Sequence, residues 1–296
     1  MFGKRRLFFS ILLAVAGAVP LLAQGEEPPA ARKLPAPVTF YLQSEKIPAG
    51  QSGGGPVACE VQLRRGRLSL GLKTGDRLLT AAGAYEWDVD EPSLEGSGEA
   101  VVFRSGRTDL TPPPAWRTLL STLPRYELWL GLFDRDHEIR FIEDSGRAEI
   151  NLAGVRLAGV EFTLKSGRLE ARFGENAAAC RSFTLSQTSG NTVLSGLGGL
   201  AAGAYTFEVD SGSLSAEFGP LKEAASFDLT LRVSSGTVTL KLPPGLACRA
   251  RASIRSGLVY LFGEHRPFGD FEISTGTGEP CVRLRLEVAS GLVRIL

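Results

Sequence analysis

The sequence predicts an all-β fold, a β-solenoid of the single-stranded β-helix type with repeats of roughly 22 residues. A glycine recurs at Gly167, Gly190, Gly212, Gly236 and Gly257, at intervals of 23, 22, 24 and 21 residues. Apolar residues occupy alternate positions on both sides of it, and polar residues lie between them. Alternation with a period of two is typical of a strand with one buried face. A fixed period in the low twenties favours stacked units that bury their apolar faces against each other.

Four copies carry the full pattern. In the first, the residues before Gly167 are Val160, Phe162 and Leu164, and those after it are Leu169, Ala171 and Phe173. The copies around Gly212, Gly236 and Gly291 repeat this spacing. Two further copies are imperfect, because Glu143, Gln187 and Thr192 stand where apolar residues are expected. Helical periodicity near 3.6 is absent from every long segment after the N-terminal leader.

The chain must turn at each Ser-Gly pair, since the inward positions before and after it are five residues apart. Glycine suits such a turn because it reaches positive φ without steric clash. A two-residue hairpin would place Lys165 opposite Arg168 and Arg104 opposite Arg107. Like charges directly opposite each other are unfavourable, so a solenoid corner is favoured. Stacked antiparallel hairpins or a β-sandwich remain as alternatives.

Residues 1–25 resemble an export signal. Lys4, Arg5 and Arg6 precede an apolar run from Leu7 to Leu22, and small residues follow before Glu26. The run is shorter than the roughly 20 residues that span a bilayer comfortably, although an uncleaved anchor is the alternative. We therefore expect an exported protein, periplasmic or extracellular at the cell envelope, that associates with membrane only if the leader is retained.

Residues 26–37 contain four prolines and few residues that could pack, so we expect a linker. Residues 38–296 form the predicted β-repeat domain. A proline run at 112–114 interrupts the repeat, and we interpret the segment from Trp116 to Leu132 as a degenerate unit, with a helical turn as one form of it. Without the leader the formal net charge is near −2, and the chain has no polybasic block. This composition argues against a nucleic-acid partner.

The four cysteines contain no C-x-x-C pair. Stacking in chain order would place Cys180 and Cys248 three repeats apart, about 14 Å at the strand spacing, which is too far for a disulfide. Cys248 and Cys281 form the only pair whose placement suits one. Otherwise the cysteines are expected to be buried free thiols. No metal or cofactor is predicted, since zinc needs three or four clustered ligands.

Two histidine segments are dense in functional groups. His137 lies within Asp134–Glu138, which we interpret as a solvated turn because no nucleophile or metal partner accompanies it. His265 lies in an aromatic loop at 260–269, interpreted as a connection between two late repeats with its aromatics packed on the end of the array. The glycines at 196, 198 and 199 are interpreted as a tight corner, since the motif lacks the Lys-Ser/Thr of a phosphate loop. No catalytic, cofactor-binding or metal residue is predicted.

The segment Leu128–Phe173 contains an apolar stretch around Trp129, a Ser145-Gly146 turn and the sequence Glu149–Val155. It is similar to bacterial "toast-rack" domains of proteins linked to envelope stress and cell-wall-antibiotic response. Residues Ser234–Pro243 look like the related "putative-adhesin" repeat family. The resemblance extends over about Val57–Leu296, and it implies a solenoid-like domain without enzymatic activity and with a role at the envelope. The chain lacks the multi-helix membrane region of many antibiotic-response members.

Three functional hypotheses follow. The first is an exported, non-enzymatic cell-envelope β-repeat protein that acts as an adhesion or interaction module for an envelope protein or glycan. The second is a polysaccharide-binding or polysaccharide-active solenoid, which would need paired carboxylates; the candidates are Asp134, Asp136, Glu138 and Glu264. The third is a mechanical spacer, whose polar faces would tolerate substitution.

Overall fold

A computed structural model describes residues 37–46, 55–85, 90–97, 99–106, 123–132, 134–176, 180–221, 226–243, 245–276, 278 and 280–296. The chain divides into two units, Met1–Leu34 and Pro35–Leu296, and every described residue belongs to the second. The predicted signal, nearly all of the predicted linker, the proline run at 112–114 and residues 116–122 lie outside this set. Within the part of the chain that the structure covers, no helix is long and apolar enough to cross a bilayer.

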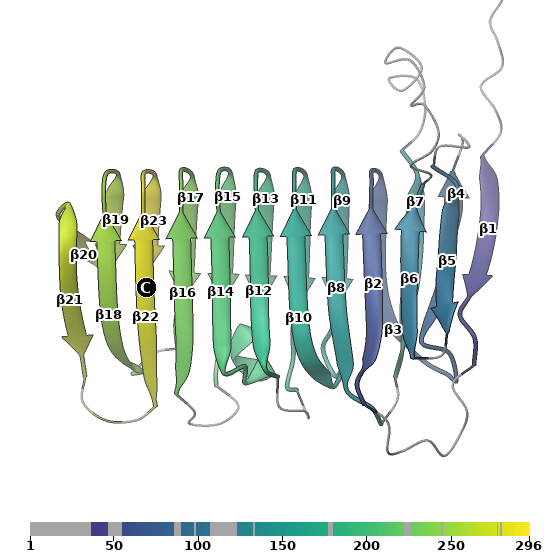
Figure 1. The fold of residues 1–296 in the computed structure, drawn as a ribbon, viewed down its shortest axis with the longest axis horizontal. Coiled ribbons are helices and arrows are strands. Elements are labelled where there is room, and N and C mark those ends of the chain that lie inside the picture. Colours follow the sequence, from purple (N-terminus) through teal and green to yellow (C-terminus); the bar gives the residue numbers. More distant parts are fainter. Residues whose placement is uncertain are drawn as a thin grey trace, which may run out of the picture. The chain divides into compact units, whose positions relative to one another are not determined.

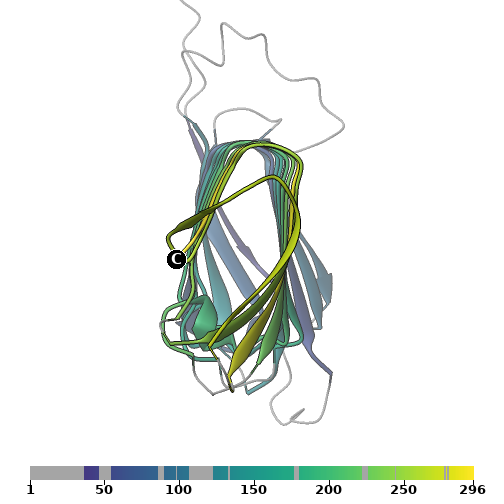
Figure 2. The same ribbon diagram turned by 90° about the vertical axis from the view of Figure 1, so that its left-hand side faces the viewer.

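The second unit is nearly all β and consists of two large sheets that face each other across one core (Figures 1 and 2). The twelve-stranded sheet contains, in spatial order, β1 (Val38–Gln43), β4 (Leu79–Tyr85), β7 (Arg125–Leu132), β3 (Arg67–Thr74), β9 (Arg147–Asn151), β11 (Arg168–Arg172), β13 (Asn191–Ser195), β15 (Ser213–Glu217), β17 (Thr237–Lys241), β23 (Leu292–Ile295), β19 (Leu258–Leu261) and β20 (Glu264–Arg266). The eleven-stranded sheet contains β21 (Gly269–Thr275), β18 (Ala247–Ile254), β22 (Cys281–Val288), β16 (Phe227–Val233), β14 (Ala204–Val209), β12 (Ser182–Gln187), β10 (Leu157–Leu164), β8 (His137–Glu143), β2 (Val57–Leu63), β6 (Ala100–Ser105) and β5 (Pro92–Ser97).

The Ser-Gly pairs are solenoid corners, as predicted. Each corner joins a strand of the eleven-stranded sheet to a strand of the twelve-stranded sheet, and we call such a pair of strands a rung. Strand β10 pairs in parallel with β8 and β12, whereas β11, which follows it across the corner, pairs in parallel with β9 and β13. The hairpin and sandwich alternatives are therefore wrong.

Stacked glycines form a continuous column along the corners, which we call the glycine spine: Gly66, Gly146, Gly167, Gly190, Gly212, Gly236, Gly291 and Gly257. These residues have φ between +87° and +132°. A Cβ on Gly190 would collide with the backbone of Gly167, and the same collision recurs at the neighbouring corners. Glycine is required here by both the backbone conformation and the close approach of successive corners.

At several corners the serine before the glycine forms a hydrogen bond to the next corner. The Ser166 hydroxyl donates to the Asp144 carbonyl at 2.7 Å, and the Ser189 hydroxyl donates to the Lys165 carbonyl at 2.9 Å. Ser211 makes the equivalent bond to the Thr188 carbonyl at 2.8 Å. These bonds satisfy corner carbonyl groups that are not part of the regular strand ladder. The recurrence of the Ser-Gly dipeptide therefore has a separate physical cause at each of its two positions.

The apolar alternation fills the space between the sheets. Phe162, Phe207, Leu231 and Leu286 are at most 1% exposed and lie in one inward row of the eleven-stranded sheet. Aromatic rings in this core contact each other edge to face; the centroids of Phe162 and Phe183 are 5.7 Å apart. Such contacts add to the stabilisation from apolar burial.

At both ends of the stack the rungs do not follow one another in chain order, so the prediction of sequential stacking is wrong there. The last rung, β22–β23, lies between β16–β17 and β18–β19. At the other end, β2–β3 lies between β8–β9 and the strands β6 and β7. Antiparallel strands then end each sheet: β20 and β21 follow β19 and β18, while β4 and β5 follow β7 and β6. Figure 1 shows β22 and β23 between the rungs β16–β17 and β18–β19.

This order changes the geometry of the cysteines. All four are free thiols. Cys180, just before β12, is four strand positions from Cys248 on β18, rather than three. Cys248 and Cys281 are on neighbouring strands, but the register pairs Cys248 with Val282, so the two cysteines are offset by one residue. Successive residues of a strand point to opposite faces, which prevents this pair from forming a disulfide.

Two segments interpreted as irregular are strands. Residues 125–132, the described part of the segment interpreted as a degenerate unit, form β7, which pairs with β3 and β4. The expected aromatic loop at 260–269 contains β20, which forms an antiparallel hairpin with β19. Phe262 packs on the core as expected, whereas Phe268 is 67% exposed, contrary to expectation. The glycines at 196, 198 and 199 do form a tight corner, around the short 3-10 helix η2 (Leu197–Leu200).

Candidate functional site

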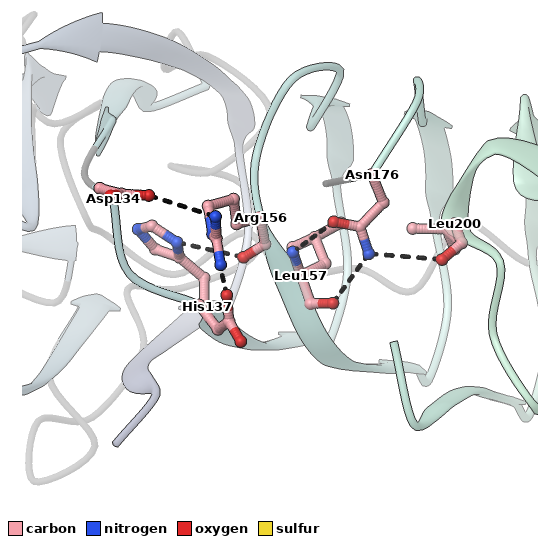
Figure 3. A network of polar contacts seen from close by, with 7 residues as sticks. Asp134, His137, Arg156, Leu157, Asn176 and Leu200 are labelled. Atoms are coloured by element: carbon pink, nitrogen blue, oxygen red, sulfur yellow. Dashed lines mark hydrogen bonds and ion pairs between the residues drawn. The ribbon is translucent and has the colours of Figure 1, made fainter. Parts of the chain in front are cut away.

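The ionisable cluster at the start of β8 is organised by an arginine from the next rung (Figure 3). The Arg156 guanidinium donates to Asp136 at 3.0 Å and to Asp134 at 3.1 Å. Asp134 is exposed, but His137 is only 1% exposed, and its Nδ1 lies 3.3 Å from the Arg156 carbonyl oxygen. Burial lowers the pKa of His137. The solvated turn is thus correct for Asp134 and wrong for His137, whose ring lies inside.

Next to this cluster, Asn176 holds the backbone of β10 (Figure 3). Its side-chain oxygen accepts from the Leu157 amide and its Nδ2 donates to the Leu157 carbonyl, both at 2.8 Å. Nδ2 also lies 3.3 Å from the Leu200 carbonyl. These bonds satisfy buried backbone groups on two successive rungs. Together, Arg156 and Asn176 brace the corners opposite the glycine spine, and their arrangement is structural.

The other two carboxylates proposed as glycosidase candidates do not complete this cluster. Glu138 lies on the outer face of β8 and forms an ion pair with Arg181. Glu264 is on β20, at the far end of the other sheet, and pairs with Arg266 at 2.5 Å. The structure therefore brings Asp134 and Asp136 together on one arginine and separates Glu264 from them.

A groove of about 520 Å³ lies on the outer face of the eleven-stranded sheet, across β6, β2, β8, β10 and β12. Its floor contains Ala100, Ala58 and Gly159, which lie in the same register row beside Glu138. The row is hollow because these residues have little or no side chain; a Cβ on Gly159 would meet nothing within 4 Å. We call this feature the outer groove.

A charged row borders the outer groove. Arg140 lies between Glu60, at 3.4 Å, and Glu161, at 3.5 Å. Ser182 and Thr184 add hydroxyl groups at one end. Guanidinium, carboxylate and hydroxyl groups can all hydrogen-bond to a polar chain lying in the hollow. The interpretation of the sequence missed this site because it followed the inward positions; the small outward residues Ala58, Ala100 and Gly159 were the available signal.

The polar residues at the imperfect inward positions lie beneath the corners and are fully buried. Gln187 donates to the carbonyls of Gly190 and Ser211, both at 3.1 Å, which explains its place in the core. Glu143 is 0% exposed and lies in register between Leu63 and Leu164. Burial raises the pKa of Glu143 to about 8, so the carboxyl group is protonated in the folded protein at neutral pH. Among the residues that the structure describes, no cluster of three or more His, Cys, Asp and Glu could hold a metal ion.

Comparison with known proteins gives distant structural similarities. No protein-family model matches the chain, and no curated protein matches it. One similar solved structure is a "putative cell adhesion protein" from Clostridium sporogenes, at 11% identity over 88% of this chain and 99% of the other, with a TM-score of 0.39. Another is a "putative adhesin" from Bacteroides fragilis, at 8% identity over 88% of this chain and 97% of the other, also with a TM-score of 0.39. Functional proposals for this protein rest on its own residues.

Proposed function

We propose that the protein is an exported, non-enzymatic β-repeat module of the cell envelope that binds an envelope protein or glycan. The observation that carries this proposal is the outer groove, a hollow of about 520 Å³ on an otherwise regular sheet face. Small residues line its floor, and its border carries arginine, glutamate and serine or threonine side chains. Concave surfaces with a few convergent polar groups are the usual form of a binding site.

The scaffold supports such a role. Stacked corners and a continuous core fix each outward side chain on a strand, at a spacing of about 4.8 Å between neighbouring rungs. Sites on strands are held more precisely than sites on loops. Adhesion or partner recognition is therefore well served by this fold, and a purely mechanical spacer would not require the hollowed, charged row.

The arrangement of the carboxylates argues against hydrolysis of a polysaccharide. A glycosidase needs two carboxyl groups that face the same bond, one of them with a raised pKa. Asp134 and Asp136 both accept from Arg156, and Glu138 is paired with Arg181. Glu143 has a raised pKa, but it is completely enclosed in the core.

Filling the outer groove tests the proposal. Gly159→Arg places a long side chain in open space on the groove floor. Ala204→Arg is the matched control, because Ala204 lies in the same register row on β14, one strand beyond Ser182. Co-sedimentation of the purified full chain with envelopes of the producing cells is the measurement. We expect Gly159→Arg to weaken binding at least about fivefold and Ala204→Arg to leave it unchanged, since only one of the two occupies the groove.

Two results would contradict the proposal. If the unmodified chain does not co-sediment with envelopes, the protein is not an envelope-binding module. If both variants bind as the unmodified chain does, the outer groove is not its contact surface.

A further inference from the structure

Four arginines form a line on the outer face of the twelve-stranded sheet. They are Arg125, Arg67, Arg147 and Arg168, on the adjacent strands β7, β3, β9 and β11, and we call them the arginine ladder. The parallel register places Arg67 opposite both Arg125 and Arg147, and Arg147 opposite Arg168. All four are exposed. Neighbouring strands are about 4.8 Å apart, so the ladder spans about 14 Å.

The fold does not require arginine at these positions. Along the same row, the next three strands carry Asn191, Ser213 and Thr237. Like charges directly opposite each other destabilise a sheet. Four consecutive arginines therefore oppose folding, while neutral residues occupy the equivalent position in the other half of the stack. This contrast points to a role in binding.

Charge pairing within the described residues leaves most of the ladder uncompensated. Arg147 pairs with Glu149 at 2.8 Å. The side chains of Arg67, Arg125 and Arg168 form no ion pair or hydrogen bond with any residue in the described ranges. The next outward row contains Glu127, Glu149 and Glu170, two residues further along the strands.

A second group of arginines shows how the fold normally treats such clusters. Arg249, Arg251, Arg283 and Arg285 lie together on the outer face of β18 and β22. Three of them have acidic partners: Arg283 contacts Asp228 at 2.5 Å, Arg251 contacts Glu272 at 2.8 Å, and Arg285 contacts Glu287 at 2.8 Å. The arginine ladder differs in having only one such partner.

We propose that the arginine ladder binds a linear acidic polysaccharide, whose carboxylate or sulfate groups lie across the strands. A guanidinium group is suited to paired hydrogen bonds with a planar or tetrahedral oxyanion. Because the cations form an evenly spaced line on a sheet face, they match a linear polymer with repeating charges better than a compact anion.

An aromatic residue on the same sheet face favours a sugar polymer. Trp129 is on β7, four residues after Arg125, and its ring lies beside Gly71 on β3 in the paired register. The Lys73 ammonium lies 5.9 Å from the centre of the ring. A half-buried indole beside a glycine presents an apolar face on which a sugar ring can stack. The near-neutral charge of the chain as a whole argues against nucleic acid as the natural polymer.

This inference adds to the proposed function a second binding site, on the sheet opposite the outer groove, with its own ligand class. The test variant replaces all four ladder arginines with serine, and the matched control replaces Arg249, Arg251, Arg283 and Arg285 with serine, so that both lose the same formal charge. Probes are heparin as a sulfated glycan, polygalacturonate as a carboxylated glycan, neutral dextran, and single-stranded DNA. Binding of the full chain is measured at low and at physiological salt.

We expect the unmodified chain to bind at least one acidic glycan in a salt-dependent manner and not to bind dextran. The ladder variant should lose at least about tenfold in affinity, whereas the control should change less than about twofold, because its arginines already have partners. The ladder variant should unfold at a temperature no lower than that of the unmodified chain, because the substitutions remove repulsion between like charges. Binding to heparin alone would assign sulfate as the recognised group, and binding to polygalacturonate alone would assign carboxylate.

Three results would overturn the inference: no binding to either acidic glycan, equal losses in the two variants, or tighter binding to DNA than to both glycans. The envelope assay separates this failure from failure of the proposed function. Suppose that the chain co-sediments with envelopes and loses that binding on Gly159→Arg, but binds neither acidic glycan. The proposed envelope-binding function then stands, and the proposal that the arginine ladder binds an acidic polysaccharide is wrong.

Discussion

At the scale of single residues, serine and glycine have different tasks at the corner. Glycine adopts a positive φ and lets one corner approach the next, while serine donates to the carbonyl of the neighbouring corner. The sequence shows the recurrence of the dipeptide and predicts the turn. It does not show the contact between successive corners, which exists only once the rungs are stacked.

Replacing a glycine of the spine with alanine tests that contact. Gly190→Ala combines backbone strain at a φ of +99° with a collision against Gly167. Gly219→Ala is the control, since Gly219 has a φ of +68° but open space around a Cβ. We expect Gly219→Ala to lower the free energy of unfolding by about 1 kcal/mol, and Gly190→Ala by clearly more, because strain and overlap add. Urea unfolding measures both, and equal losses would contradict the stacked spine.

Glu143 makes the stability of the fold depend on pH. Its pKa is about 8 in the folded protein and close to the ordinary value of 4.5 when unfolded. The stabilising contribution of the protonated carboxyl is complete below the unfolded pKa and is lost as pH rises through the folded value. The free energy of unfolding of the unmodified chain, relative to that of Glu143→Leu, should therefore fall between about pH 5 and pH 8. The measurement is this difference between the two proteins at pH 5 and at pH 8, and the same difference at both pH values would refute this account.

At the scale of elements, the regular middle of the stack could be predicted from alternation and spacing, whereas its two ends could not. A rung presents the same kind of inward residues on both sides, so Leu231 can neighbour Leu286 on β22 or Ala252 on β18. The structure selects β22, the strand later in the sequence. The periodicity of the sequence does not indicate which of two equivalent rungs lies next to a given rung.

The bracing of the corners opposite the spine depends on Asn176. Asn176→Ala would leave the Leu157 amide and carbonyl without their side-chain partner in a buried site. We expect a loss of about 1–3 kcal/mol in unfolding free energy. Asn191→Ala is the control, because among the described residues the side chain of this half-buried asparagine accepts one hydrogen bond, from the Ser213 hydroxyl, and its loss should cost less. Thermal unfolding of the two variants checks this, and equal melting temperatures would show that Asn176 does not hold the rungs.

At the scale of the whole molecule, the candidate surfaces lie on the outward positions, where the repeat is not regular. The dipeptide Gly-Arg at Gly66-Arg67, Gly146-Arg147 and Gly167-Arg168 was a visible signal for the arginine ladder. Arg125 does not follow a glycine, because β7 joins this row of strands through a different connection. The outer groove likewise requires the order of β6, β2, β8 and β10, which follows from the displaced N-terminal rung. Function on a solenoid depends on which rungs are neighbours.

The parallel, in-register stacking of glycine-cornered rungs is tested most directly by a distance between two outward residues of adjacent rungs. Nitroxide labels at Thr206 on β14 and Thr230 on β16, in a chain with its native cysteines replaced by alanine, would lie in register on neighbouring strands. The account predicts strong dipolar broadening, because the labelled backbone positions are only about 5 Å apart. Spectra without such broadening would place the two rungs apart and contradict the stacked solenoid.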